Sequence, residues 1–144
     1  MVHWDRSLIG QECSRFTQHV TRALLLEYAD LMGARDPIHL DSAAAQARGY
    51  RDIIAPQPFV LWRSGTPLTP PAMQFHGVGI NAGYECHFHR PVYPDDILFY
   101  TTFLVDMYEK TGRSGTMRFV VRETTVTNQH GELVAWLRNP FILD

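Results

Sequence analysis

The sequence has few of the features that mark specialised classes of protein. Its two cysteines, Cys13 and Cys86, are too few for a disulfide framework and lack the spacing of zinc ligands. No apolar run approaches the roughly 20 residues that a membrane-spanning helix needs. The first ten residues, MVHWDRSLIG, lack the charged-then-apolar pattern of a secretory signal. These absences favour a soluble protein of the reducing cytoplasm.

An excess of charge of either sign is also absent. The chain has 13 lysines and arginines against 15 aspartates and glutamates, a formal net charge of −2, and the two signs are mixed along it. Without a strong basic field, neither nucleic acid nor an anionic membrane is an expected partner. There is no internal repeat. At 144 residues, of which 45% are hydrophobic, we expect residues 1–144 to form a single domain with one core.

The first half of the chain, residues 1–79, carries the helical patterns. Residues 11–19 indicate a short strand, and residues 22–32, RALLLEYADLM, place apolar side chains at helical spacing after a capping residue, Thr21. Gly33 is expected to end that helix, and Pro37 to prevent its restart. A second short helix is expected at SAAAQARGY, a buried helix at FVLWRSG (residues 59–65), and a loop at TPLTPPAMQFHG.

The second half, residues 80–144, indicates strands separated by glycine-containing turns. The expected strands are INAGYECHFHRPV, DILFYTTFLVDMYEK, TMRFVVRETTVT and LVAWLRNPFIL. Long antiparallel strands need a cover for their apolar face, and the helix after Pro58 is the candidate cover. We therefore expect an α+β hotdog fold, in which a curved antiparallel sheet wraps a central helix. The open sheet edges predict a dimer, with a second copy or with a related chain.

The stretch GARDPIHLD, Gly33–Asp41, contains the best candidates for catalysis. Pro37 stiffens the connection between Asp36 and His39. A histidine titrates near neutral pH, and a nearby carboxylate can orient it or share its proton, so the two residues could form a general acid–base pair. The spacing alone favours a simpler interpretation, a turn in which Asp36 caps the backbone and His39 packs or faces solvent.

Residues 28–39, YADLMGARDPIH, resemble the signature segment of the MaoC-like dehydratases and (R)-specific enoyl-CoA hydratases. The similarity continues through residues 40–60 and resumes at residues 85–134, which resemble the N-terminal-type half of double-hotdog dehydratases. The resemblance implies a lyase that hydrates a 2-enoyl thioester, or dehydrates a 3-hydroxyacyl thioester. The acyl carrier would be coenzyme A or a carrier protein, and no metal or redox cofactor would be required.

In that family an aspartate and a histidine activate a water, and a backbone N–H at the start of the central helix polarises the thioester carbonyl. By position, His39 matches the histidine, while Gln57, followed by Pro58, falls where that N–H is commonly donated by a glycine. Ala34 occupies the aspartate position, and Asp36 stands where the family has asparagine.

Three interpretations of this departure stay open. Asp36 could take over the acid–base role beside His39. The chain could instead be a non-catalytic hotdog subunit that pairs with a catalytic hotdog chain and shapes an acyl tunnel. The scaffold could also perform another elimination or a cyclisation in a biosynthetic pathway.

Three arginines are candidates for binding the phosphates of coenzyme A, namely Arg48, Arg51 and Arg63, because guanidinium groups pair well with phosphate. A solvated helix face is the alternative explanation for each of them. His87 and His89 share one side of a strand, but no third ligand accompanies them, so we expect no metal site. The candidate substrate-binding residues are thus Gln57, Pro58, Arg48 and Arg51.

Overall fold

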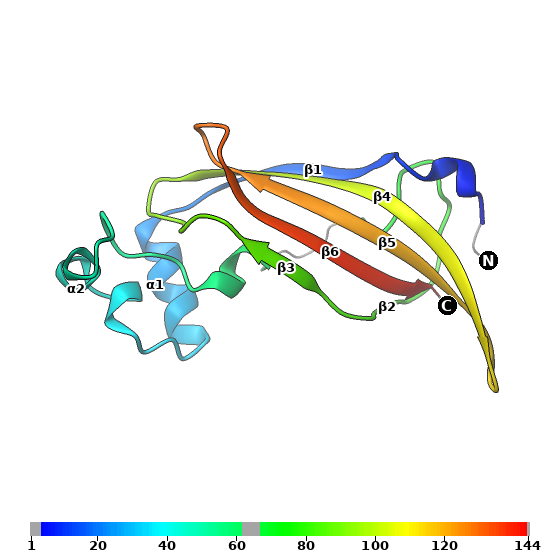
Figure 1. Ribbon diagram of the computed structural model, residues 1–144, viewed down its shortest axis with the longest axis horizontal. Helices are drawn as coiled ribbons and strands as arrows, with labels where there is room; N and C mark the ends of the chain where they lie inside the picture. The colour runs from blue at the N-terminus through cyan, green and yellow to red at the C-terminus, as the bar shows by residue number, and fades with distance from the viewer. Residues whose placement is uncertain (1–3, 62–66, 144) are drawn as a thin grey trace.

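The computed structural model describes residues 4–61 and 67–143, and its strands form one curved antiparallel sheet (Figure 1). The strand order is β1-β4-β5-β6-β2, and β3 pairs with the same strand, β6, as β2 does. The strands are β1 (Glu12–His19), β2 (Gly79–Asn81), β3 (Glu85–Phe88), β4 (Ile97–Gly112), β5 (Gly115–Thr127) and β6 (Leu133–Leu143). The helices are η1 (Arg6–Leu8), α1 (Arg22–Leu31), η2 (Pro37–His39), α2 (Ser42–Ala47) and η3 (Gln57–Leu61).

The strand expected over residues 80–92 is divided into β2 and β3. The break follows Asn81, whose Oδ1 accepts a hydrogen bond from the N–H of Gly83 at 2.9 Å. Gly83 has φ of 135°, a conformation that glycine adopts without steric cost. Asn139 on β6 fixes the turn by donating to Asn81 Oδ1 at 3.0 Å and to the carbonyl of Gly83. A side-chain turn therefore interrupts the ladder at this edge.

One extra residue in β4, Val105, bends the long strands. Leu104 pairs with Arg122, whereas the next paired residue, Asp106, pairs with Val121. Such a bulge increases local bend and twist. It also lets both Leu104 and Met107 lie fully buried on the concave face although they are three residues apart.

Helix α1 covers one end of the concave face. Thr21 caps it as expected, accepting a hydrogen bond from the N–H of Leu24 at 3.1 Å. Its buried side chains, Leu25 and Tyr28, belong to the same apolar cluster as Leu98 and Tyr100 of β4. Gly33 follows the helix with φ of 65°, so the expected helix end is confirmed.

The helix expected at residues 59–65 is described only as far as residue 61. That part is the single 3₁₀ turn η3, and residues 62–66 lie outside the described residues. Pro58 is tolerated in this turn because the first N–H groups of a helix have no acceptor within the helix. Phe59 of η3 packs edge-on against Tyr28, with ring centroids 5.3 Å apart. Among the described residues at this end, α1 is the longer of the two helices.

The opposite end of the sheet has a second cover. There Leu8 of η1 and Met73, from the loop expected at residues 66–77, pack on Leu104, Met107 and Phe141. Of the helices in the described ranges, none has the length and apolar content needed to cross a lipid bilayer.

Candidate active site

The connector between α1 and α2 brings Asp36 onto Arg48. Asp36 is the N-cap of η2, and its Oδ1 accepts a hydrogen bond from the N–H of Ile38 at 3.1 Å. Arg48, just after α2, donates to both carboxylate oxygens of Asp36 at 3.0 and 2.9 Å. The hydrogen bond from Ile38 and the guanidinium of Arg48 hold the pKa of Asp36 below its usual value. Asp36 is therefore an ionised, exposed carboxylate.

His39 is held by a different segment. Its Nδ1 lies 2.7 Å from the carbonyl oxygen of Ile54, so Nδ1 carries the proton and donates it to that oxygen. Ile54 returns a hydrogen bond from its N–H to the carbonyl of Ile38 at 3.1 Å. In this tautomer Nε2 keeps its lone pair, which is the form of imidazole that can accept a proton.

Among the hydrogen bonds of the described residues, none connects the side chain of Asp36 to the side chain of His39. Each has its own partner, Arg48 and Ile54 respectively, although the charge of a protonated His39 would still lower the pKa of Asp36. Ala34, at the position where an aspartate was expected from the resemblance, donates its N–H to the carbonyl of Ala29 at 2.8 Å. The connector thus holds an imidazole with a fixed tautomer beside an acid that is bound elsewhere.

Gln57 borders a pocket of about 210 Å³. As the first residue of η3 it has a backbone N–H without an acceptor inside its own helix. The lining residues are Tyr50, Ile54, Ala55, Pro56, Gln57, Val60, Phe88, His89, Arg90, Pro91 and Val92. Asp36 and His39 are not among them, but Ile54, which binds the His39 ring, is. We call this hollow the Gln57 pocket.

Pro58 faces a different hollow, which is apolar and open to the surface. It is lined by Tyr28, Leu31, Met32, Pro58, Leu61 and Tyr84 and has a volume of about 370 Å³. Leu31 and Met32 are 69% and 60% exposed, which is high for adjacent apolar residues. Gln57 and Pro58 are adjacent in sequence but thus line two different hollows.

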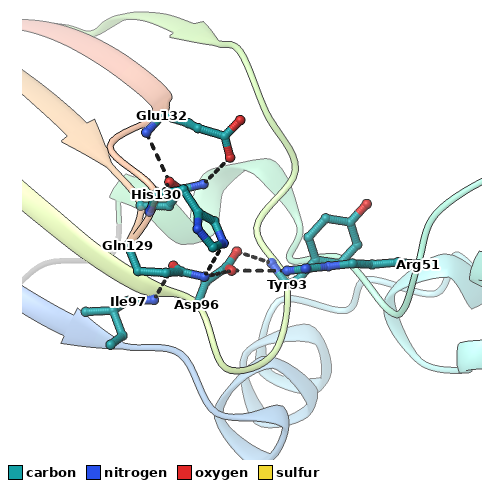
Figure 2. Close-up of polar contacts among 8 residues, drawn as sticks. Arg51, Tyr93, Asp96, Ile97, Gln129, His130 and Glu132 are labelled. Carbon is teal, nitrogen blue, oxygen red and sulfur yellow. Dashed lines mark hydrogen bonds and ion pairs between the residues drawn. The ribbon is translucent and has the colours of Figure 1, made fainter.

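Arg51 is part of a polar network centred on Asp96 (Figure 2). Its Nη2 donates to Asp96 Oδ1 at 3.2 Å, and its guanidinium lies over the ring of Tyr93, 4.2 Å from the centroid. Asp96 also accepts hydrogen bonds from Gln129 Nε2 at 3.0 Å and from the N–H of Tyr93 at 2.9 Å. Arg48 and Arg51 therefore lie at different sites, and Arg63 lies outside the described residues.

The role of Asp96 was not predicted from the sequence. It lies in the run RPVYPDDI, where a positive φ of 70° at Asp95 turns the chain and leads the buried side chain of Asp96 inward. Its partners lie 45 and 33 residues away, at Arg51 and Gln129. The one signal in the local sequence was an aspartate directly before a long apolar strand.

Comparisons with known proteins agree with this fold. Residues 7–137 match the family described as FAS1-like, dehydratase domain region. The chain is 26% identical to a UPF0336 protein of Saccharopolyspora erythraea over 144 residues, covering 96% of this chain and 90% of that protein.

Two solved structures share the architecture. R-hydratase PhaJ1 from Pseudomonas aeruginosa has a TM-score of 0.71 at 23% identity, covering 94% of this chain and 81% of that one. The HadBC (3R-hydroxyacyl-ACP dehydratase) complex from Mycobacterium tuberculosis has a TM-score of 0.73 at 22% identity, covering 94% of this chain and 96% of that one.

The chain therefore has the hotdog fold of these two structures, and the family match supports the resemblance noted at residues 28–39. Because the family match spans most of its length, the chain belongs to the FAS1-like dehydratase-region family. The family is described as a dehydratase domain region, and the two solved structures are a hydratase and a dehydratase complex.

Proposed function

We propose that this chain takes part in the dehydration of a 3-hydroxyacyl thioester, or the reverse hydration of a 2-enoyl thioester. In this proposal it is the substrate-binding chain of a two-chain hotdog enzyme. The observation that carries the proposal is that Arg48 and the N–H of Ile38 bind Asp36, while Ala34 occupies the expected acid position. The HadBC complex, a dehydratase of two chains, shares the fold and supports this arrangement.

In this role the chain would contribute binding and orientation. The backbone N–H of Gln57 would donate to the thioester carbonyl oxygen, where negative charge grows as the α-proton leaves. The partner chain would supply the aspartate and histidine that remove the proton from the α-carbon and return it to the departing hydroxyl. The bonds broken are C–H and C–O, and the products are the enoyl thioester and water.

The apolar hollow at Pro58 is the surface we assign to the partner. It lies beside the sheet edge formed by β2 and β3, where Val78, Ile80 and Tyr84 are also exposed. An unpaired edge with exposed apolar side chains is suited to pairing with a second sheet. A related hotdog chain would cover both the edge and the hollow, which makes the partner part of the proposal.

A second candidate is that this chain is catalytic by itself. The observation that favours it is the fixed tautomer of His39, whose Nε2 can accept a proton while the ionised Asp36 lies nearby. In that case His39 would act as the general base and Asp36 would stabilise the imidazolium electrostatically.

The two candidates are separated by an assay with crotonyl-CoA and a longer 2-enoyl-CoA, following the loss of enoyl absorbance. The purified chain is measured alone and then with a hotdog chain from the same genome that keeps the complete aspartate–histidine signature. The two-chain proposal expects turnover only in the mixture, unchanged by His39→Ala. Turnover by the chain alone that is lost in His39→Ala and kept in His19→Ala, an exposed histidine on β1, would establish the second candidate.

A further inference from the structure

A second, polar hollow lies next to the Gln57 pocket, beside the segment Arg90–Asp96. The Gln57 pocket and a second hollow of about 360 Å³ share two lining residues, Arg90 and Pro91. The second hollow is lined by Arg51, Arg90, Pro91, Tyr93, Asp96, Asn128, His130 and Glu132. We call it the arginine groove. The Gln57 pocket thus adjoins, at Arg90 and Pro91, a hollow bordered by two arginines and a histidine.

Arg51 is held in place on one side of this groove. Its carboxylate partner, Asp96, has a side chain only 4% exposed, whereas the side chain of Arg51 is 60% exposed. Tyr93 supports the flat face of the guanidinium, and Gln129 bonds Asp96 from the side opposite Arg51 (Figure 2). Gln129 is itself fixed, because its Oε1 accepts the N–H of Ile97 at 3.0 Å. The position of Arg51 is therefore set by a buried network.

Arg90 is held by the turn between β5 and β6. Its Nη1 lies 2.9 Å from Oε2 of Glu132. Asn128 binds the same glutamate twice, donating from Nδ2 to Oε1 at 3.1 Å and accepting the N–H of Glu132 at 3.1 Å. The N–H of His130 also donates to Asn128, at 3.0 Å, which keeps His130 beside the groove.

These ion pairs leave donors for a ligand. A guanidinium has five N–H donors. Among the described residues, the ion pair of Arg51 uses Nη2 and that of Arg90 uses Nη1. Asp96 and Glu132 each have both oxygens engaged by this chain, so they orient the arginines and have little capacity left to repel an anion. Two part-exposed guanidinium groups on one hollow supply the charge and the N–H donors that pair with a phosphate group.

We propose that the arginine groove binds the phosphate of a 4′-phosphopantetheine arm, with the arm running back to its thioester in the Gln57 pocket. This inference rests on the proposed function, because that function makes the substrate a thioester. The same phosphate is present in coenzyme A and in the prosthetic arm of a carrier protein. Arg51 and Arg90 are the residues that would contact it.

The test compares 4′-phosphopantetheine with pantetheine, which differ only in the phosphate. Binding to the full chain is measured from amide chemical-shift changes at up to about 1 mM ligand. The wild-type chain is expected to bind the phosphorylated arm about tenfold more tightly, as expected for charge-assisted hydrogen bonds. Arg51→Ala and Arg90→Ala should each reduce this preference, and the double variant should abolish it.

Arg118→Ala is the matched control. Arg118 is also a half-exposed arginine paired with a glutamate, Glu109 at 3.0 Å, but it lies on the β4–β5 hairpin outside the groove. Its removal changes the net charge equally and should leave the preference unchanged. Arg51→Lys separates loss of the charge from disruption of the fold. It keeps the positive charge and should therefore keep part of the preference for the phosphorylated arm. Equal binding of the two arms by the wild-type chain, no binding at all, or an equal effect of Arg118→Ala would overturn the proposal.

Coenzyme A and a holo acyl carrier protein then distinguish the two sources of the phosphate. The natural carrier is the one of the two whose affinity for the chain falls in Arg51→Ala. Failure of the proposed function has a different signature. In that case the chain would bind phosphopantetheine through Arg51 and Arg90 and yet support no dehydration with any hotdog partner.

Discussion

Arg48 donates to both carboxylate oxygens of Asp36, at 3.0 and 2.9 Å, although the two residues are 12 positions apart and η2 and α2 lie between them. The connector between α1 and α2 presents His39 with its Nδ1 donated to Ile54, so the acid and the histidine are oriented by different partners. Arg48 consequently binds the carboxylate with which a catalytic histidine would otherwise pair. This pairing is the feature on which the first two predictions depend.

Removal of Arg48 should raise the pKa of Asp36. The pKa of Asp36 is depressed by the hydrogen bond from Ile38 and by Arg48, so Arg48→Ala leaves the first cause and removes the second. A carboxyl group with a depressed pKa stabilises the fold above its unfolded-state pKa and loses that contribution as the pH falls through its folded-state pKa. Below about pH 4 the free energy of unfolding should therefore fall more steeply in wild type than in Asp36→Asn.

The measurement is an NMR titration of the Asp36 carboxyl, combined with denaturant unfolding at several pH values. Arg15→Ala is the control, because Arg15 pairs with Glu12 on β1 and should leave the titration of Asp36 unchanged. An unaltered Asp36 titration in Arg48→Ala would contradict the assigned pairing.

Restoring the family's acid should create activity in the isolated chain. In Ala34→Asp combined with Asp36→Asn, a carboxylate returns to the position that the family uses, and the competing pair with Arg48 is removed. The isolated wild-type chain should show only the uncatalysed background, and we expect the variant to hydrate crotonyl-CoA at least about a hundredfold above it, the lower end of what a positioned acid–base group supplies. Adding His39→Ala should return the rate to the wild-type level, and a gain that survives this change would exclude His39 as its source.

Cys13 should be inert in the folded protein. Burial raises the pKa of its thiol to about 11, and the charge of Arg122 offsets only part of this rise. Because the folded-state pKa lies above the unfolded one, the thiol's contribution to stability is complete at neutral pH. It is lost between about pH 9 and pH 11, as the unfolded chain deprotonates first.

Mass spectrometry after alkylation at pH 8 should thus find Cys13 unmodified until the protein is unfolded. The free energy of unfolding should also decline more steeply with pH in wild type than in Cys13→Ser across that alkaline window. Rapid labelling of native Cys13 would show that this position is open to solvent.

Leu31→Glu should weaken association with the partner. Leu31 lines the apolar hollow beside the β2–β3 edge and is 69% exposed, so the substitution places a charge in the assigned interface with little effect on the fold. We expect at least about a tenfold loss of affinity in analytical ultracentrifugation, equivalent to about 1.4 kcal/mol. Met117→Glu changes an exposed apolar residue on the β4–β5 hairpin and should bind like wild type. Equal losses in the two variants would place the interface elsewhere.

Local patterns predicted most of the fold because they depend on neighbours in the sequence. Helix α1, its cap Thr21 and its terminal Gly33 follow from spacing and from single-residue chemistry, and so do the long strands β4, β5 and β6. The break between β2 and β3 has a local signal in Asn81 and Gly83, but its fixation by Asn139, 58 residues from Asn81, depends on the fold. The helix expected after Pro58 is described only as far as Leu61, where it is part of the 3₁₀ helix η3.

The candidate site was less predictable because its contacts join residues that are far apart in the sequence. The sequence indicated that Asp36, His39, Gln57, Arg48 and Arg51 carry chemistry, and the comparisons supported the class of enzyme. Which carboxylate meets which cation is decided by the fold. Arg51 binds Asp96 at a separation of 45 residues, and Arg48 binds the acid that had been assigned to His39.

The single additional residue at Val105 changes how the strand must be compared with its relatives. Before it, inward-facing positions of β4 have even numbers, as at Leu98, Tyr100 and Leu104; after it they become odd, as at Met107. A gap misplaced by one position in an alignment would exchange lining and outer-surface residues along the rest of the strand. Any inference about which substitutions change the buried face of this strand in related chains must therefore apply this change of parity at Val105.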